Sequence, residues 1–431
     1  MNKEIRQAYA ILKKVYNDQS FAGIELNKTI RREYGNVNTN LITKIVYGVI
    51  EKDVYLDYAI NQFVSSKPKK DVSLLLKLGT YILKFLDSIP AFACVDEIVE
   101  ITKLSHNKTL AGFVNATLKN ISKKEIMLPA KENGLVQYLS IRYSYPEWIV
   151  EKLLKEHKEQ FVEDLLAKEL TTLTHIRVLK NKISIDDFLQ LLTKNNVEYK
   201  ISAFENTFYV EYSQLLKIKD IQDCYIVQGL PSMIVSKNIA EDSKKILDLC
   251  ASPGGKSVLI AQENPNIEII SCDVSDFRVE LINKYIQSYD IKNVKTCLND
   301  ATILREDWIE QFDTVMCDVP CSNLGIANKK PDVLLNRTSD GLKEIIELQL
   351  KIIETASKYV KPGGVLLYST CSIMKEENEI IVGKFLQNNK KFKISNVNTY
   401  GVEVEKYHNL VTFYPHISNC EGFFIGRLVK Q

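Results

Sequence analysis

Apolar residues recur at helical spacing through the first part of the chain. In several segments they lie three and four positions apart, which places them on one face of an amphipathic helix. Polar or proline-bearing stretches, such as residues 65–70 (SSKPKK), separate these segments. The pattern predicts an all-α domain over residues 1–130. Its expected helices span residues 2–16, 41–51, 55–64, 72–86, 95–104 and 111–121.

The middle of the chain mixes helical and strand periods, so we expect a small α+β domain over residues 138–230. Residues 127–136 are irregular and are expected to form a linker. His175 and Arg177 lie on a predicted strand; contact with RNA is one interpretation, and a surface position is the expectation. The expected elements are helices at residues 141–156, 160–166 and 185–195 and strands at residues 173–179, 199–201 and 207–211.

From Ser243 onward, short apolar β-prone runs alternate with longer amphipathic segments. This alternation is typical of a parallel sheet that helices cover on both faces. We therefore predict a doubly wound, Rossmann-like α/β domain over residues 231–431, with a last strand at residues 422–428 that suits an antiparallel addition to the sheet edge. The other expected strands are residues 245–250, 267–272, 294–298, 314–317 and 365–369, and the helices are residues 255–262, 277–289, 342–360 and 376–387.

Composition is that of a globular protein, with 45% hydrophobic and 26% charged residues. The sequence has no apolar run of membrane-spanning length and no apolar signal region at its N-terminus, so a cytoplasmic location is expected. Nine scattered cysteines fit a reducing compartment better than a disulfide framework. The five histidines form no ligand cluster with them, so no metal is expected.

Charge is unevenly spread although the net charge is only +2. Residues 1–130 carry 19 Lys and Arg and 13 Asp and Glu, a balance of +6. A basic region on a nearly neutral chain suggests contact with a polyanion such as RNA. A solvated lysine surface explains the charge equally well.

A glycine-containing loop, residues 250–257 (CASPGGKS), follows the first strand of the α/β part. A phosphate-binding P-loop needs glycine where Cys250 stands, and the dinucleotide fingerprint GxGxxG is absent. The remaining interpretation is a tight turn that brings a ligand close to backbone. Asp273 and Asp300 follow the next two strands, where they are placed to hold ribose hydroxyls and an adenine amino group. Strand-end capping is the alternative, but acids at successive strand ends favour a nucleoside site.

Asp318, Cys321 and Cys371 form the candidate catalytic set. Asp318 ends a predicted strand and Cys321 follows on a loop, while Cys371 comes directly after another strand, so both thiols are expected to face one site. Methylation of carbon 5 of a pyrimidine requires a thiolate that adds at carbon 6, a carboxylate at the N3 edge and a second acid or base. These three residues supply that set.

Four segments have a distinctive sequence and order: residues 247–256 (LDLCASPGGK), 318–325 (DVPCSNLG), 366–379 (LLYSTCSIMKEENE) and 421–428 (EGFFIGRL). Through them nearly the whole chain resembles the RsmB/Sun (Fmu) family of bacterial 16S rRNA cytosine-5 methyltransferases. The N-terminal helices, with YGV at residues 47–49, resemble the NusB-like RNA-binding domain found fused to such enzymes.

The resemblance implies methyl transfer from S-adenosylmethionine to a cytosine of 16S rRNA, cytosine 967 in the family, through a covalent cysteine adduct. The family's nucleophile matches Cys371, and Cys321 matches the cysteine that helps to release the product. A monomer that binds 16S rRNA through its first two domains is expected. The positions that match the cofactor site are Cys250, Ala251, Ser252, Pro253, Gly254, Gly255, Lys256, Asp273, Arg278, Asp300 and Asp318.

The chain departs from the family pattern at three positions that concern the target-base loop and the interdomain connection. The family usually has glycine at Asn323, aspartate at Gly229 and a tryptophan near Leu334 or Leu335.

Other functions stay open at this point. A cytosine-5 methyltransferase of tRNA or another RNA would use similar chemistry, and DNA enzymes attack with the cysteine of the Pro-Cys motif, which here is Cys321. A non-catalytic RNA-binding protein of the antitermination type would not need Asp318, Cys321 and Cys371 together.

Overall fold

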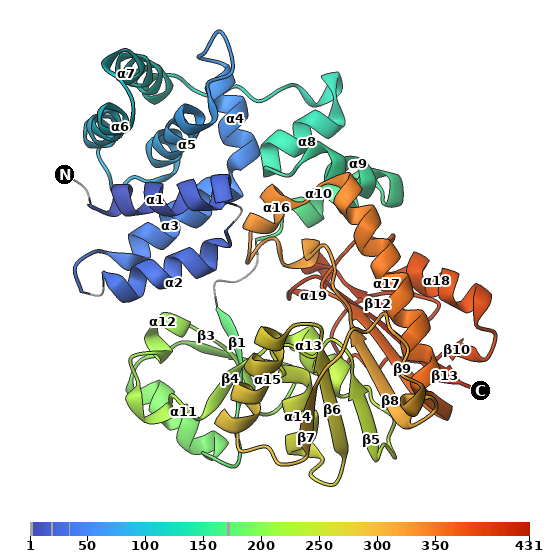
Figure 1. The fold of residues 1–431 in the computed structure, drawn as a ribbon. Coiled ribbons are helices and arrows are strands. Elements are labelled where there is room, and N and C mark those ends of the chain that lie inside the picture. The colour runs from blue at the N-terminus through green and yellow to red at the C-terminus, as the bar shows by residue number, and fades with distance from the viewer. Residues whose placement is uncertain (1–2, 19, 34, 170–172) are drawn as a thin grey trace. The chain divides into compact units, whose positions relative to one another are not determined.

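The computed structural model contains two compact units (Figure 1). It describes residues 3–18, 20–33, 35–169 and 173–431. The first unit consists of residues 1–167 and the short segment 327–338, and the second of residues 168–326 and 339–431. None of the helices in the described residues combines the length and the apolarity that crossing a bilayer requires.

The first unit is all-α, as the helical spacing predicts, and the apolar faces of its helices share one core. The side chains of Asn38 and Asn107 accept hydrogen bonds from the N–H groups of Leu41 and Leu110, at 3.1 and 2.9 Å, and so cap two of the helices. Asn2, the expected start of the first helix, lies outside the described residues. The six predicted helices are α1 (Lys3–Asp18), α3 (Thr39–Glu51), α4 (Asp53–Asn61), α5 (Lys70–Phe85), α6 (Ala91–Ser105) and α7 (Lys108–Lys123).

The sequence pattern misses one helix of this unit, α2 (Ala22–Arg32). Two of its four buried residues, Glu25 and Thr29, are polar, so its apolar period is weak. The Glu25 carboxylate accepts bonds from Lys14 and Lys28, both at 2.8 Å, and these bonds lower its pKa. A buried charge whose partner comes partly from another helix gives no local signal of burial.

Three further helices belong to the first unit by their contacts, although the sequence assigns most of their residues to the middle domain. After α8, Ser144 adopts a left-handed φ of 60°, and its hydroxyl oxygen accepts hydrogen bonds from the N–H groups of Val54 and Tyr55, at 3.0 and 3.3 Å. These bonds cross 90 and 89 residues of sequence, which no local pattern can indicate. The helices are α8 (Leu135–Tyr143), α9 (Glu147–Glu156) and α10 (Glu159–Ala167).

The segment 327–338, which contains α16 (Asp332–Asn336), completes the first unit. The carboxylate of Asp332 is buried and accepts a hydrogen bond from the N–H of Ala22 at 3.1 Å, at the start of α2. Tyr145 donates its hydroxyl to the Asn328 side chain at 2.9 Å, and Leu335 packs against the helical core. Polar and apolar contacts together therefore anchor this segment.

The second unit is built on a nine-stranded mixed sheet. Five strands run parallel, and β13 joins β9 in the antiparallel direction, as the sequence predicts for the last strand. The strand order is β11-β12-β13-β9-β8-β5-β6-β7, with β10 paired to β13. The strands are β5 (Lys245–Asp248), β6 (Glu268–Asp273), β7 (Val294–Leu298), β8 (Phe312–Asp318), β9 (Val360–Thr370), β10 (Phe392–Ile394), β11 (Glu405–Tyr407), β12 (Leu410–Phe413) and β13 (Phe423–Lys430).

Helices cover both faces of this sheet, which confirms the doubly wound, Rossmann-like prediction (Figure 1). Ile246 packs with Ile260 of α14, whereas its strand neighbour Leu247 packs with Ile353 of α17. Successive strand residues point to opposite faces, so the two helices lie on opposite sides. The helices of this region are α13 (Leu230–Ser236), α14 (Gly255–Glu263), α15 (Asp276–Ser288), α17 (Ser339–Tyr359), α18 (Glu379–Asn388) and α19 (Pro415–Ser418).

A smaller antiparallel sheet, of order β2-β3-β1-β4, forms the α+β part of the second unit. Phe188 and Leu192 of its long helix share a core with Phe208 of the sheet. Its elements are β1 (Thr174–Val178), α11 (Ile185–Lys194), β2 (Tyr199–Ile201), β3 (Thr207–Val210), α12 (Tyr212–Leu215) and β4 (Tyr225–Val227).

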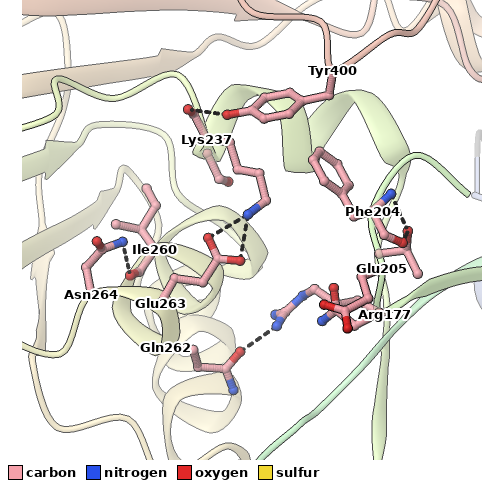
Figure 2. Close-up of polar contacts among 12 residues, drawn as sticks. Arg177, Phe204, Glu205, Lys237, Ile260, Gln262, Glu263, Asn264 and Tyr400 are labelled. Carbon is pink, nitrogen blue, oxygen red and sulfur yellow. Dashed lines mark hydrogen bonds and ion pairs between the residues drawn. The ribbon is translucent and has the colours of Figure 1, made fainter. Parts of the chain in front are cut away.

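Polar contacts join the small sheet to the part of the same unit that is built on the nine-stranded sheet (Figure 2). Arg177 donates from Nη1 to Oε1 of Gln262 at 2.7 Å, and Lys237, whose ammonium pairs with Glu263, lies 5.1 Å from the centre of the Phe204 ring. The expected surface position of His175 and Arg177 is wrong, since they are only 2% and 4% exposed. Their strand lies in the interior of its sheet and forms this junction. Both side chains therefore form hydrogen bonds with other residues of the protein.

We expect Asp332→Ala to lower the free energy of unfolding by about 1–3 kcal/mol, because it leaves the buried N–H of Ala22 without an acceptor. Asp332→Asn should lose less, since an amide oxygen can still accept this bond. Denaturant unfolding followed by circular dichroism measures the change. Asp340→Ala removes an exposed carboxylate that pairs with Lys343 and should leave the unfolding midpoint unchanged. Equal midpoints for Asp332→Ala and the unmodified protein would contradict the anchoring role.

Candidate active site

The structure brings the two candidate cysteines together at one edge of the sheet. β8 and β9 pair in parallel with Asp318 opposite Ser369, so their carboxyl ends lie side by side. Cys321 follows the first strand and Cys371 the second, and their sulfur atoms are 3.0 Å apart. Both are reduced thiols.

The two cysteines differ in their surroundings. Cys321 is 6% exposed, whereas Cys371 is more accessible. The contact with Cys371, followed by burial and the nearby Glu377 carboxylate, raises the pKa of the Cys321 thiol well above its ordinary value. A thiolate therefore forms less readily on Cys321.

Asn323 contacts both sulfur atoms. Its side-chain oxygen accepts a hydrogen bond from the Cys371 thiol at 2.7 Å and lies 3.6 Å from the sulfur of Cys321. Its φ of 63° is left-handed, a conformation that glycine adopts freely and asparagine tolerates better than most residues. The departure from glycine at this position thus keeps the loop conformation and adds an acceptor beside the thiols.

Asp318 lies at the end of β8, where two donors hold its carboxylate. Ser369 donates its hydroxyl to Oδ1 at 2.8 Å, and the ammonium of Lys256 forms an ion pair with Oδ2. Burial alone would lower the pKa of Lys256, but the carboxylates of Asp318 and Asp248 outweigh it, so the pKa is raised and the ammonium stays charged. Lys256 therefore fixes Asp318.

The loop from Cys250 to Lys256 connects β5 to α14, as predicted. Gly254 has a φ of +109°, and a Cβ there would lie 3.3 Å from the Ile282 side chain, so the loop requires glycine at this position. α14 begins at Gly255, and the first-turn amides of a helix have no partner within the helix. Such amides bind anionic groups.

A cavity of about 200 Å³ lies at the carboxyl ends of the strands. Asp273 lines this cavity. Among the described residues, its carboxylate accepts a hydrogen bond from the Val274 N–H at 2.8 Å, and Nη1 of Arg278 lies 3.6 Å from its Oδ1. Asp300 accepts from the backbone and hydroxyl of Thr302, and these bonds lower its pKa. The lining residues are Leu249, Cys250, Asp273, Val274, Arg278, Asn299, Asp300, Ala301, Thr302, Pro320, Leu348 and Ile352.

The family model described as 16S rRNA methyltransferase RsmB/F matches residues 237–429, and the NusB family model matches residues 4–123. The chain fits the RsmB/F methyltransferase family. The all-α domain at its N-terminus is a NusB domain, as the resemblance implied.

Relatives match over nearly the full length of the chain. The probable ribosomal RNA small subunit methyltransferase B of Bacillus subtilis (strain 168) is 28% identical, over 98% of each chain. Ribosomal RNA small subunit methyltransferase B of Erwinia tasmaniensis is 26% identical, over 98% of this chain and 97% of its own. The crystal structure of PH0851 has the same fold, with a TM-score of 0.83, 23% identity and 99% coverage of both chains.

Methyltransferases of the RsmB/F family use S-adenosylmethionine, and the cavity fits its nucleoside part. The apolar side chains of Leu249, Leu348 and Ile352 offer a surface to an adenine ring, and the two carboxylates can accept hydrogen bonds from hydroxyl and amino groups. The buried Nδ2 of Asn299 has no hydrogen-bond partner among the described residues. An unsatisfied donor of this kind is expected where a ligand supplies the acceptor.

Two residues of the site were not predicted from sequence. Asn299 immediately precedes Asp300, and its proximity to that strand-end acid is the signal that could have identified it. Glu377 lies in an acidic run (KEENE), which resembles a solvated surface, yet it is completely buried beneath the cysteine loops. No local pattern indicates that burial.

We expect Asp273→Ala to weaken the binding of S-adenosylmethionine by about 1–3 kcal/mol, because the hydroxyls of its ribose would lose their acceptor. Isothermal titration calorimetry measures this loss directly. Glu280→Ala removes an exposed carboxylate from α15, outside the cavity, and should leave the affinity unchanged. If both variants bind as tightly as the unmodified protein, Asp273 is only a strand-end cap.

Proposed function

We propose that this protein transfers a methyl group from S-adenosylmethionine to carbon 5 of a cytosine in 16S rRNA, with cytosine 967 as the expected target. The observation that carries the proposal is the pair of thiols 3.0 Å apart, beside Asp318. Pro320, which directly precedes Cys321, also lines the cavity that fits the cofactor. The groups that cytosine-5 chemistry needs are thus next to the methyl donor's site.

Cys371 is the proposed nucleophile. Its thiolate adds to carbon 6 of cytosine, which forms a C6–S bond and moves an electron pair onto carbon 5. S-adenosylmethionine, when bound, would supply the methyl group that carbon 5 takes up with this electron pair, and the electrons of the broken S–CH3 bond would stay on its sulfur. A base then removes the proton from carbon 5, the C5–C6 double bond reforms, and the Cys371 thiolate leaves with the electrons of the C6–S bond.

Asp318 is proposed to bind the N3 edge of the target base. Lys256 and Ser369 hold its carboxylate in one orientation, so it needs no rearrangement when the base enters. As the thiolate adds to carbon 6, negative charge spreads onto the ring, and N3 takes up a proton from solvent. A carboxylate beside N3 stabilises that protonated form.

Cys321 is proposed to help release the product. Its thiol is buried and its pKa is raised, so it stays protonated while the more accessible Cys371 attacks. The small thiolate fraction of a thiol with a raised pKa is a correspondingly strong base, so it is suited to take the proton from carbon 5 and return to the thiol. This asymmetry argues against attack by Cys321, the arrangement of the DNA enzymes.

The choice of 16S rRNA rests on the family and on its relatives, whose names specify the small ribosomal subunit. The NusB domain, with an excess of six positive charges over residues 1–130, is proposed to hold RNA by its phosphates. Methylation of tRNA would use the same catalytic groups and is distinguished by mapping the modified base. A non-catalytic protein would have no use for Asp318, Cys321 and Cys371 at one edge.

Replacement of each cysteine is expected to stop the reaction at a different stage. Cys371→Ala should bind RNA and cofactor yet form no covalent complex and transfer no methyl group. Cys321→Ala should accumulate an RNA-linked protein that survives denaturing electrophoresis, because Cys371 still attacks while release is slow. Transfer of a labelled methyl group from the cofactor to 16S rRNA measures the first result, and denaturing electrophoresis of the protein with 16S rRNA measures the second.

Cys224→Ala serves as a control, since this thiol lies in the small α+β part and should leave transfer unchanged. A stable complex in Cys371→Ala and none in Cys321→Ala would reverse the assigned roles.

A further inference from the structure

Glu377 is a buried carboxylate that the steps above do not use. It is 0% exposed and accepts four hydrogen bonds, all from neutral donors. The backbone N–H of Ser322 and the amide of Gln349 donate to Oε1 at 2.8 and 3.0 Å. The hydroxyls of Ser322, at 2.5 Å, and of Ser372 donate to Oε2.

The positions of these donors connect Glu377 to both sulfur atoms. Ser322 directly follows Cys321, and Ser372 directly follows Cys371. The Gln349 amide also donates to the carbonyl of Pro320 at 2.9 Å, so the residue before Cys321 is held as well. One carboxylate therefore fastens the two loops at the residues that adjoin the thiols.

The arrangement suits a carboxylate. The Ser322 N–H and the Gln349 amide can only donate, and the two hydroxyls donate as well, whereas with a glutamine the hydroxyls would have to turn and accept from its amide. An anion in a dry interior is costly unless its hydrogen bonds are satisfied, so each of the four bonds resists displacement. The group is thus both rigid and chemically specific.

We propose that Glu377 is a positioning residue whose carboxylate sets the separation of Cys321 and Cys371 and keeps their roles distinct. The inference rests on the proposed function, because it assigns Glu377 to the two-cysteine reaction. A displacement of about 1 Å in reacting groups costs on the order of 100-fold in rate, so the distance between the loops matters for catalysis.

The negative charge of Glu377 also helps to keep the roles of the two cysteines distinct. The titratable groups that interact electrostatically with Cys321 are Cys371, Glu377 and Tyr368. The Tyr368 hydroxyl donates a hydrogen bond to the backbone carbonyl of Glu377 at 2.7 Å. After the Cys371 contact and burial, the Glu377 carboxylate contributes to the raised pKa of Cys321. Removing that charge should favour a thiolate on the wrong cysteine.

The first experiment measures methyl transfer by Glu377→Gln. We expect kcat to fall by about 10- to 100-fold, while the dissociation constant for S-adenosylmethionine stays within about twofold because Glu377 does not line the cavity. Ser322→Ala and Ser372→Ala should each cause a smaller loss, and neither should add to the loss in Glu377→Gln. Additive losses would overturn the proposal.

Glu379→Gln is the matched control, since this glutamate lies two residues away and accepts instead from the Thr412 hydroxyl at 2.9 Å. It should leave kcat unchanged. An equal loss in Glu379→Gln would show that the segment is merely structural and would overturn the proposal.

A second experiment does not depend on RNA. Alkylation of Cys321 by iodoacetamide, followed at a series of pH values by peptide mass spectrometry, should begin at lower pH in Glu377→Gln than in the unmodified protein. An unchanged profile would overturn the proposal even if the unmodified protein methylates no RNA, a result that would instead refute the proposed function. If Glu377→Gln does not fold, methyl transfer by Ser322→Ala/Ser372→Ala decides: a fall in kcat is expected, and an unchanged kcat would overturn the proposal.

Discussion

The site exists because β8 and β9 lie side by side and run in the same direction. Their register places Asp318 opposite Ser369, and the loops that carry Cys321 and Cys371 leave the sheet at that level. A shift of the register by one residue would turn Asp318 to the other face of the sheet and separate it from Ser369. The distance between the sulfurs, the orientation of Asp318 and the position of Lys256 all follow from this pairing.

Backbone contacts beyond the strands keep the two loops at this distance. The N–H of Gly325 donates to the Cys371 carbonyl at 3.0 Å, and the N–H of Gly422 donates to the Gly325 carbonyl at 2.8 Å. A Cβ at Gly325 would lie 2.2 Å from the Gly422 oxygen and 2.9 Å from the Cys371 oxygen. Only glycine permits so close an approach, so the Pro-Cys loop is fixed by backbone on one side and by the Glu377 carboxylate on the other.

Polar groups around the site differ in how far their hydrogen-bonding capacity is met within the protein. Glu377 is satisfied by four donors, whereas Nδ2 of Asn299, on the wall of the cofactor cavity, has none among the described residues. Glu377 therefore holds the protein's own loops, whereas the open donor of Asn299 is available to a ligand in the cavity.

The sequence by itself determined the elements and the residues at their ends. Helical and strand periods are local, so they predicted six helices of the first unit, the parallel strands and the acids Asp273, Asp300 and Asp318 at strand ends. Only the tertiary structure decided which polar residues are buried, which helices share a unit and how far apart the thiols lie. The burial of Arg177 and Glu377 and the union of α8 with α4 depend on partners far away in sequence. A local pattern contains no information about such partners, since the hydrogen bonds that make burial possible form only when the chain has folded.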